Sequence, residues 1–526
     1  MEKRGMRYGF VAMLFSMLIA LAAFAPSTAF ADMFTVNNKT DLQQALDNGG
    51  EVTLGDNITG SVTVPSGKTV TLNLNGHTLT ADQKYAAITN NGTLTIAGPG
   101  TVDGSNLSQT AAIYNAPSGV ANLNGGTFTG SKWYVIKNLG TMTIDGASVA
   151  QDDAGSSAID NGYFGNAGND CGVSEPSSAT VSLTIINGSF SGGMNVVKND
   201  DFGVLSITGG TFTNTDGPAV LNWNKATIDG GDFSVNNSAS GVIANGSYGA
   251  NSPDKGELII NAGTFTAPNN GSGNIFAQGQ GGTSGGTAVV SGGSYNGSLD
   301  NLSNLNVDVE VSGGSFTDAA VAKYVKSGNV AMSANQGNGF QVVSEETAEA
   351  NAAAKVQNGD SVIYFANIED AKKFAEDNHI DPSFVEQLRF VITYVDGLTD
   401  AAYGPTCTVP AGQKLTKAAI DTPDGEELVP AKEGYTFTGW YLDKELTQKA
   451  TFPFEPNSDM ELYAGFSKND PAVNPSQGDN KTTTTTTKTS SAKTGDNLAL
   501  FGGLLALVAV AGATAAVVVV RHRKSE

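Results

Sequence analysis

The sequence predicts a mainly β protein whose central part is a solenoid of parallel coils, a parallel β-helix. Three observations lead to this prediction. The 526 residues include 65 glycines and only 15% charged residues, a composition typical of turn-dense β structure. A short motif that ends in an aromatic residue recurs along residues 34–343. Asparagine recurs beside this motif, about once per repeat.

The recurring motif has the form apolar-x-Gly-Gly-x-aromatic, and each copy marks one turn of the solenoid. The basic period is 22 residues from Phe190 to Phe212 and 21 from Phe212 to Phe233. Residues before each glycine pair alternate between apolar and polar, as in a strand with one buried face. The glycines permit a sharp corner. Leucine-rich repeats share the period, but their Leu-x-x-Leu-x-Leu pattern is absent. The motif residues fall at Leu79, Phe128, Val149, Phe190, Phe212, Phe233, Phe265, Tyr295 and Phe316.

A second series supports the same coils. It consists of Asn90, Asn115, Asn138, Asn161, Asn199, Asn222 and Asn245. Stacked side-chain amides can donate hydrogen bonds to one another along a solenoid axis, as a ladder. Asparagine also suits turns, and the two explanations are compatible.

The solenoid is predicted to span residues 32–344 and to need a cover over its first coil. Residues 41–46 form a short amphipathic pattern in that place and predict a cap helix. Residues 345–388 are predicted as a helical connector. Within them, residues 368–378 predict a helix with Ile368, Ala371, Phe374 and Ala375 on one face.

Two stretches resemble known families. Residues 34–343 resemble the right-handed β-helix of the pectate-lyase-like superfamily, a likeness that implies a shape and no activity. Residues 389–466 contain GYTFTGWY at 434–441 and end in LYAGF at 462–466. They resemble the Listeria–Bacteroides repeat, the internalin B-type β-grasp module, although most copies end in Trp where Phe466 stands here. This resemblance implies a spacer or interaction module, with Trp440 as a core residue.

The N-terminus has the pattern of a secretory signal peptide over residues 1–31. Lys3, Arg4 and Arg7 precede an apolar run at residues 10–24, and small residues lead up to a cleavage point between Ala31 and Asp32. The alternative is a membrane anchor, for which the apolar run is short.

The C-terminus combines a Thr-rich spacer at residues 467–490 with an apolar run at 498–520 and a basic tail. Between them stand Ser491, Ala492, Lys493, Thr494 and Gly495. This order resembles the sorting signal of sortase-anchored Gram-positive surface proteins, whose motif is Leu-Pro-x-Thr-Gly. The resemblance implies cleavage after Thr494 by a sortase and linkage of Thr494 to peptidoglycan. Ser491 and Ala492 replace Leu and Pro, so an uncleaved protein held in the membrane by residues 498–520 is the alternative. Both place the bulk of the chain outside the cell.

Composition and motifs argue against several functions. The net charge of −22 argues against a nucleic-acid partner. Lyases of the β-helix type typically use an arginine base and Asp-bound calcium, and residues 32–388 contain no arginine. Hydrolases use carboxylate pairs, for which Asp152/Asp153 and Asp200/Asp201 are the candidates. We therefore predict no enzyme and no catalytic residue. A surface polysaccharide lyase or glycoside hydrolase and a passive structural protein are the alternatives.

One edge of the solenoid is the candidate binding site. Insertions at residues 162–178 and 246–256 fall at one register, three coils apart, and should emerge on one face. The residues expected there are Tyr163, Phe164, Asp200, Asp201, Phe202, Trp223 and Tyr248. Exposed aromatic rings beside hydrogen-bonding groups suit a carbohydrate or a host matrix protein; alternatively, the rings pack the loops onto the body. No cofactor is predicted, and calcium held by Asp170 and Glu175 is a weaker candidate. The leading hypothesis is a non-catalytic adhesin or ligand-binding rod.

Overall fold

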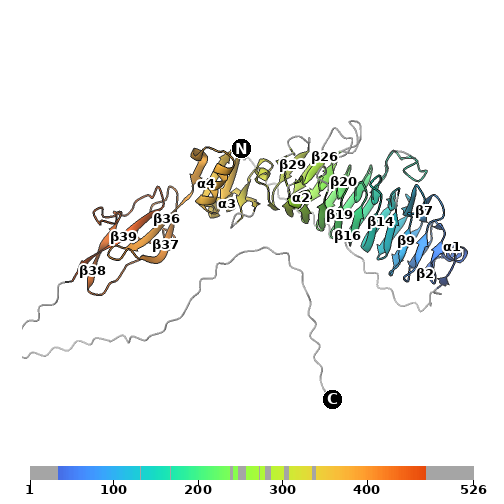
Figure 1. Cartoon of the computed structure of the whole chain (residues 1–526), viewed down its shortest axis with the longest axis horizontal. Helices are drawn as coiled ribbons and strands as arrows, with labels where there is room; N and C mark the ends of the chain where they lie inside the picture. The colour runs from blue at the N-terminus through green and yellow to red at the C-terminus, as the bar shows by residue number, and fades with distance from the viewer. Residues whose placement is uncertain are drawn as a thin grey trace, which may run out of the picture. The chain divides into compact units, whose positions relative to one another are not determined.

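The computed structural model describes residues 34–469, apart from 131, 166, 237–240, 247–255, 272, 279–285, 301, 303–306 and 335–338. This part of the chain forms a β-solenoid, a cap at its C-terminal end and a further small sheet (Figure 1). The predicted signal peptide, sorting signal and apolar run 498–520 lie outside the described residues, as does the predicted spacer except for residues 467–469, of which 467 and 468 belong to a strand. Among the described residues, no helix is long and apolar enough to cross a membrane.

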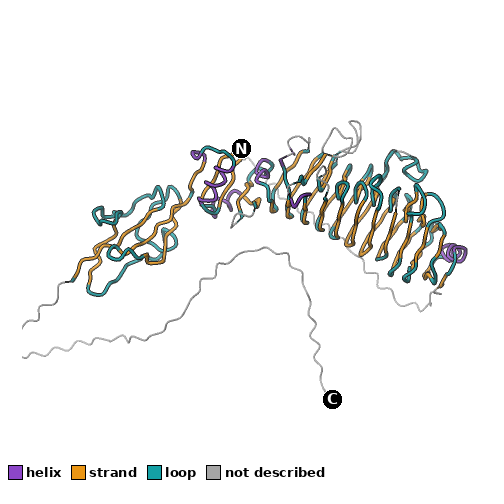
Figure 2. Tube along the Cα trace, viewed as in Figure 1, coloured by secondary structure: helices purple, strands orange, loops and turns teal. Residues whose placement is uncertain are grey.

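Most coils of the solenoid contribute strands to three columns, in which equivalent strands of neighbouring coils pair in parallel (Figure 2). The first column contains β1 (Phe34–Val36), β2 (Gly50–Leu54), β5 (Thr69–Asn73), β8 (Thr93–Ala97), β11 (Val120–Asn124), the first halves of β14 (Thr141–Gln151) and β16 (Val181–Gly192), β18 (Gly203–Ile207), β21 (Lys225–Ile228), β24 (Glu257–Ile260), β27 (Thr287–Val290) and β29 (Asp308–Val311). The second column contains β3 (Ile58–Thr59), β6 (Thr78–Thr80), β9 (Thr101–Asp103), β12 (Thr127–Gly130), the second halves of β14 and β16, β19 (Thr211–Asn214), β22 (Asp232–Val235), β25 (Thr264–Thr266), β28 (Ser294–Asn296) and β30 (Ser315–Phe316).

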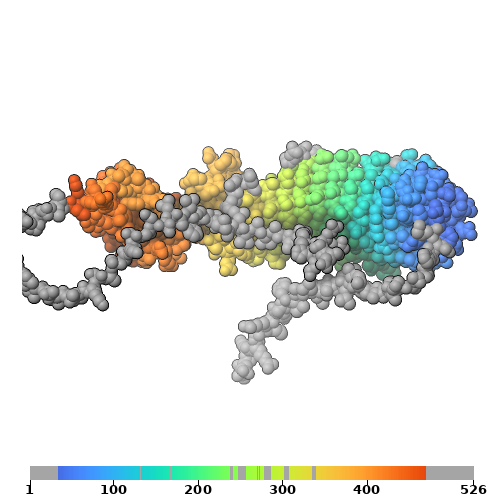
Figure 3. All heavy atoms as spheres, turned by 90° about the horizontal axis from the view of Figure 1, so that it is seen from below, coloured from blue at the N-terminus to red at the C-terminus, as the bar shows by residue number. Residues whose placement is uncertain are grey.

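The third column is called the ladder column, because it carries the asparagines. It contains β4 (Val62–Val64), β7 (Tyr85–Asn90), β10 (Thr110–Asn115), β13 (Ile136–Asn138), β15 (Ile159–Asn161), β17 (Val197–Asn199), β20 (Val220–Asn222), β23 (Ile243–Asn245) and β26 (Phe276–Gln278). Figure 3 shows the atoms of successive coils following one another in colour order, so that each coil packs against its sequence neighbours.

The predicted motif residues form a buried aromatic stack on the inside of the second column. Rings at residues 190, 212, 233, 265, 295 and 316 lie face to face, with centroids 4.5–4.9 Å apart. The corner before each ring needs glycine: Gly231 has φ +105°, and a Cβ there would lie 3.2 Å from the Gly210 carbonyl oxygen. The motif and its spacing therefore mark the coils as predicted.

The predicted asparagine ladder is confirmed. From Asn90 to Asn245, the Nδ2 of each ladder asparagine donates to the Oδ1 of the next at 2.7–2.8 Å. All seven side chains are fully buried. Their remaining donors bond to backbone carbonyls, as in the bond from Asn138 Nδ2 to Ser182 O at 3.0 Å. The ladder thus satisfies polar groups that the corners would otherwise leave buried and unpaired.

The predicted N-terminal cap helix is confirmed as α1 (Lys39–Asn48), which extends beyond residues 41–46 at both ends. It begins at Asn38, whose side chain accepts a hydrogen bond from the Asp41 backbone at 3.0 Å. It buries Leu42, Ala45 and Leu46 on the first coil. Gln43 exchanges two 2.8 Å hydrogen bonds with the backbone of Thr63 in β4. The helix therefore covers the open edge of the ladder column.

The C-terminal end differs from the prediction. Parallel stacking stops at β30, and residues 317–388 form a C-terminal cap with strands of its own rather than a helical connector alone. Its elements are η2 (Ala319–Lys323), β31 (Asn329–Ser333), β32 (Phe340–Ser344), α3 (Glu345–Asn351), β33 (Ala354–Asn358), β34 (Ser361–Phe365), α4 (Ile368–Asp377), η3 (Pro382–Phe384) and β35 (Val385–Gln387). Because β32 pairs antiparallel with β30, it closes the edge of the second column. The predicted helix 368–378 is present as α4, with Ala371 and Ala375 buried.

A four-stranded sheet follows, here called the repeat module. The order of strands across this sheet is β37 (Ala402–Pro410), β36 (Arg389–Asp396), β39 (Met460–Lys468) and β38 (Tyr435–Tyr441). Strands β36 and β39 are parallel. Trp440 is a core residue, as predicted, and its ring lies 5.0 Å from that of Tyr394 and 5.6 Å from that of Phe437. A short helix, α2 (Pro268–Gly271), also lies in the solenoid.

Candidate functional site

The residue before each ladder asparagine lies on the outer side of the ladder column. In three successive coils this residue is Lys137, then Asp160, then Lys198, and the three are direct partners in the strand register. On a bare solenoid these charges would face water. Here all three are buried, Lys137 and Asp160 completely.

The insertion after Asn161 is what buries them. Its first residues pair with the next coil, since the Tyr163 backbone donates to the Asp201 carbonyl at 3.0 Å. Further along, Asp170 returns over the column and places Oδ1 2.8 Å from Lys137 Nζ. The Phe164 backbone N–H donates to the same carboxylate at 3.0 Å. The insertion is therefore folded onto the solenoid and fastened by a charged contact.

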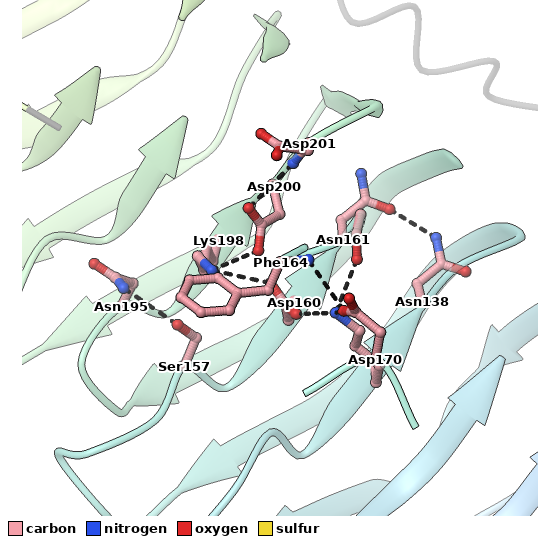
Figure 4. Close-up of polar contacts among 12 residues, drawn as sticks. Asn138, Ser157, Asp160, Asn161, Phe164, Asp170, Asn195, Lys198, Asp200 and Asp201 are labelled. Atoms are coloured by element: carbon pink, nitrogen blue, oxygen red, sulfur yellow. Dashed lines mark hydrogen bonds and ion pairs between the residues drawn. The ribbon is translucent and has the colours of Figure 1, made fainter. Parts of the chain in front are cut away.

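Five side chains form a buried charge network: Lys137, Asp160, Asp170, Lys198 and Asp200. Figure 4 labels four of them, Asp160, Asp170, Lys198 and Asp200. Lys137 Nζ lies 2.5 Å from Asp160 Oδ2, and Lys198 Nζ lies 2.5 Å from Asp200 Oδ2. Asp160 Oδ1 is 3.9 Å from Lys198 Nζ and links the two pairs. Such a network is costly to bury unless each charge is matched.

The network shifts its own pKa values. Burial raises the pKa of Asp200 to about 8, against the opposing effect of Lys198, and the like charge of Asp160 adds to the rise. Burial alone would lower the pKa of Lys137, but Asp160 and Asp170 outweigh it and raise that pKa above its usual value. Burial thus opposes ionisation of Asp200, whereas the neighbouring carboxylates favour the ammonium form of Lys137.

Beside the network lies a pocket of about 240 Å³, here called the aromatic pocket. Its lining comprises Trp133, Tyr134, Gly155, Ser156, Ser157, Phe164, Asn169, Met194, Asn195, Lys198 and Trp223. The rings of Trp133 and Tyr134 are 5.0 Å apart, and those of Phe164 and Trp223 lie 6.1 Å apart and nearly parallel. Lys198 Nζ lies 4.1 Å from the Phe164 ring centre and 4.2 Å from that of Trp223, so the pocket shares one wall with the charge network.

Two residues that line the pocket each have a buried polar atom with no hydrogen-bond partner among the described residues: Trp133 Nε1 and Asn195 Oδ1. Both side chains are buried, and Asn195 Nδ2 donates to Ser157 Oγ at 3.2 Å (Figure 4). A buried donor or acceptor without a partner is unfavourable, and in native proteins such groups usually have one. A ligand hydroxyl is a suitable partner, because it donates to a carbonyl oxygen and accepts from an indole N–H.

The predicted edge is only partly brought together. Tyr163 and Trp223 are 2% and 3% exposed, and Phe164 and Phe202 are half-buried. The expectation of exposed rings is therefore wrong for Tyr163 and Trp223, because the insertion packs onto the coils. Phe164 and Trp223 do line the aromatic pocket, and Asp200 forms an ion pair with Lys198, which also lines it. Asp201 lies half-buried beside Asp200, and Tyr248 falls outside the described residues.

Sequence reasoning identified only Phe164 and Trp223 of the pocket lining, and the residues that it missed include Trp133, Tyr134, Asn195 and Lys198. One signal was available for Lys198. It directly precedes a ladder asparagine, as do Lys137 and Asp160, so the order Lys, Asp, Lys in an outward position marks a charged column. Trp133 and Asn195 precede the ladder strands in the turns of different coils. The sequence around Trp133 and the sequence around Asn195 contain no signal that these two turns come together at one pocket.

The carboxylates considered as catalytic pairs or as calcium ligands have different environments in the structure. Asp152 is exposed, and Asp153 Oδ1 accepts a hydrogen bond from the Gly155 backbone at 2.7 Å, as in a turn. Asp200 is engaged by Lys198. Asp170 is engaged by Lys137, while Glu175, its predicted partner in calcium binding, is exposed. In the part of the chain that the structure describes, no cluster of three or more His, Cys, Asp or Glu residues is arranged to hold a metal.

Comparison with known proteins supports one part of the chain. Residues 392–465 match the family model of the Listeria-Bacteroides repeat domain, in agreement with the resemblance seen over residues 389–466. The comparisons with curated proteins and with solved structures give no match. The repeat is typical of bacterial surface proteins. The chain therefore carries a Listeria-Bacteroides repeat beside its β-solenoid.

Proposed function

We propose that this protein is a non-catalytic surface adhesin that binds a carbohydrate through the aromatic pocket. In this proposal a right-handed β-helix of the pectate-lyase-like type presents the pocket, and the β-grasp-like repeat module and the Thr-rich spacer hold it away from the cell. A signal peptide cleaved after Ala31 directs export. A sortase then joins Thr494 to peptidoglycan, or residues 498–520 remain in the membrane.

One observation carries the proposal: aromatic rings line a pocket, and two of its lining residues each have a buried polar atom without a hydrogen-bond partner among the described residues, Trp133 Nε1 and Asn195 Oδ1. A sugar ring offers C–H faces to aromatic rings and hydroxyl groups to such atoms. Ligand pockets usually measure roughly 300–1,000 Å³. At about 240 Å³, this one suits a single sugar unit better than a long chain.

Charge favours a neutral sugar. Lys198 contributes a positive charge to the pocket wall, which disfavours a cationic ligand. Asp160 Oδ1 lies 3.9 Å from Lys198 Nζ and offsets part of the lysine's charge, so the attraction of Lys198 for an anionic ligand is reduced. A neutral hydroxyl-bearing ring is the ligand class that remains.

The test uses recombinant residues 32–466 on a panel of glycans and host matrix proteins, scoring retained protein and released products together. We expect retention on a glycan with a neutral terminal sugar and no released product. Release of oligosaccharides would overturn the non-catalytic assignment and favour a lyase or hydrolase. Retention on a matrix protein alone would identify a protein ligand instead.

Two variants locate the site. Trp133→Phe keeps an aromatic ring and removes the N–H, and should raise Kd by roughly 5- to 100-fold. Trp223→Ala should abolish detectable binding, because it removes a wall of the pocket. The matched control is Phe384→Ala, which removes a half-exposed ring in the C-terminal cap and should bind like the wild type. Wild-type affinity in a folded Trp133→Phe variant would contradict the proposed pocket.

A further inference from the structure

The buried lysine at the centre of the charge network lies in contact with two carboxylates. Lys137 Nζ is 2.5 Å from Asp160 Oδ2 and 2.8 Å from Asp170 Oδ1, and the Gly162 carbonyl oxygen lies at 2.8 Å. The side chains of Lys137, Asp160 and Asp170 are all 0% exposed. An amine, a carboxyl group and a second carboxyl group are thus held together without access to water.

From this geometry we infer that Lys137 and Asp160 condense to form an intramolecular amide bond between Nζ and Cγ, with Asp170 as the proton-transfer group. The bond would join β13 to β15, whose residues 137 and 160 are direct partners in the strand register. It would therefore be a covalent rung between two successive coils. This inference goes beyond the proposed function and does not depend on it.

The reaction needs no reagent that the site lacks. Asp170 accepts a proton from the Lys137 ammonium group, and the free amine attacks Cγ of Asp160. The C–N bond forms and one C–O bond of Asp160 breaks. Of the three ammonium protons, one stays on the amide nitrogen, and two leave with the Asp160 oxygen as water. Asp170 returns the proton that it carried, so it is unchanged at the end.

The surroundings favour this condensation in two ways. The groups are held in place by the strands and the insertion, which replaces a bimolecular encounter by an intramolecular one. They also lie beside an apolar cluster that includes Tyr114, Tyr134 and Tyr163, with the Tyr134 ring 5.2 Å from Lys137 Nζ. Burial penalises the ion pair, while an amide carries no charge to desolvate. The product is therefore favoured where an exposed lysine and aspartate would remain ionised.

The ammonium form of Lys137 limits the rate of amide formation. The two carboxylates raise the pKa of Lys137, so the free amine is a minor species and the proton transfer to Asp170 must come first. We therefore expect the bond to form slowly after folding. Denatured chain should not form it, because the three groups separate.

The second ion pair provides an internal control. Lys198 Nζ is also 2.5 Å from an aspartate, Asp200, but the two residues are only two positions apart in the chain. Lys198 also lines the aromatic pocket, and its other carboxylate neighbour, Asp160 Oδ1, lies at 3.9 Å. It thus lacks a second carboxylate in contact, and we expect it to keep a free amine.

The test is the intact mass of the purified native protein, followed by peptide mapping. The expected mass is lower than the sequence mass by one water molecule. Trypsin should fail to cut after Lys137, and fragmentation of the linked peptides should place the bond at Asp160. A native sample that stays at full sequence mass after prolonged incubation would overturn the inference, and so would a bond to Asp170.

Variants separate the roles of the residues. Lys137→Arg should have full mass for its sequence, while Lys198→Arg should still lack one water. Asp170→Asn keeps the side-chain shape and should fold, yet its water loss should slow at least about 10-fold, since one positioned proton-transfer group contributes roughly 10²–10⁴-fold. An unchanged rate in Asp170→Asn would remove the proton-transfer role. Circular dichroism checks that each variant is folded.

Discussion

At the scale of single residues, Asp200 makes stability depend on pH in an unusual direction. Its pKa rises from 3.8 to about 8 on folding, mainly through burial. As pH increases between those values, the unfolded chain loses this proton and the folded chain keeps it. Folding is therefore favoured below about pH 4, and the contribution of Asp200 is lost by about pH 8. The loss is at most about 1.4 kcal/mol per pH unit.

Asp200→Asn tests this expectation, because asparagine resembles the protonated acid and does not titrate. The difference in unfolding free energy between variant and wild type should grow in favour of the variant from pH 4 to pH 8. Urea unfolding at several pH values measures it. Asn124→Ala, at an exposed position without an ionisable group, should keep the wild-type pH dependence. Parallel curves for wild type and Asp200→Asn would show that Asp200 is ionised in the folded protein.

At the scale of elements, the asparagine ladder binds neighbouring coils together. Asn138 accepts from Asn115 Nδ2 at 2.7 Å and donates to Asn161 Oδ1 at 2.7 Å. Asn138→Ala removes both bonds and leaves buried polar groups without partners. Unfolding free energy should fall by about 1–3 kcal/mol, which chemical denaturation can measure.

Asn124→Ala is the matched control for the ladder, since Asn124 lies at the exposed end of β11. Its cost should stay within about 0.5 kcal/mol. Equal costs at positions 124 and 138 would mean that the amide ladder adds little to stability and that asparagine was retained for its turn conformation alone.

The same elements show what the sequence can and cannot predict. The coils were predictable because each repeats one local pattern, so the positions of Phe212 and Asn199 follow from their neighbours along the chain. The strands of the C-terminal cap were not predictable, because β33 and β34 occur once and are specified by pairing with each other and with β31. The burial of Trp223 could not be predicted either, since it depends on how the insertion at residues 162–178 folds back onto the coils.

The candidate site also has a part that was predictable from the sequence and a part that was not. Its residue types were visible in the sequence, and the structure places Phe164 and Trp223 on either side of Lys198, the lysine that pairs with Asp200. Their partners Trp133 and Asn195 come from other coils, and only the stacking of coils brings them to the pocket. A repeat fixes which residues share a face, whereas an insertion decides which of them remain exposed.

At the scale of the whole solenoid, stability and solubility depend on closing both ends. Every coil is an edge for the next, and an uncovered edge is a template for pairing with another chain. Helix α1 covers one end through Gln43 and its apolar face. At the other end β32 pairs with β30, matching Ser315 to Gln341 and Phe316 to Phe340. This pairing protects the last ring of the aromatic stack.

Removing the C-terminal cap should therefore promote association between chains. We expect residues 32–316 to form oligomers or aggregates, because β29, β30 and the Phe316 ring become exposed, whereas residues 32–388 should remain monomeric. Sedimentation velocity at several concentrations distinguishes these results. The two fragments share every coil of the solenoid, so a difference between them belongs to the cap. A monomeric 32–316 fragment with the thermal stability of 32–388 would mean that the solenoid end is self-limiting, and that residues 317–388 serve another purpose.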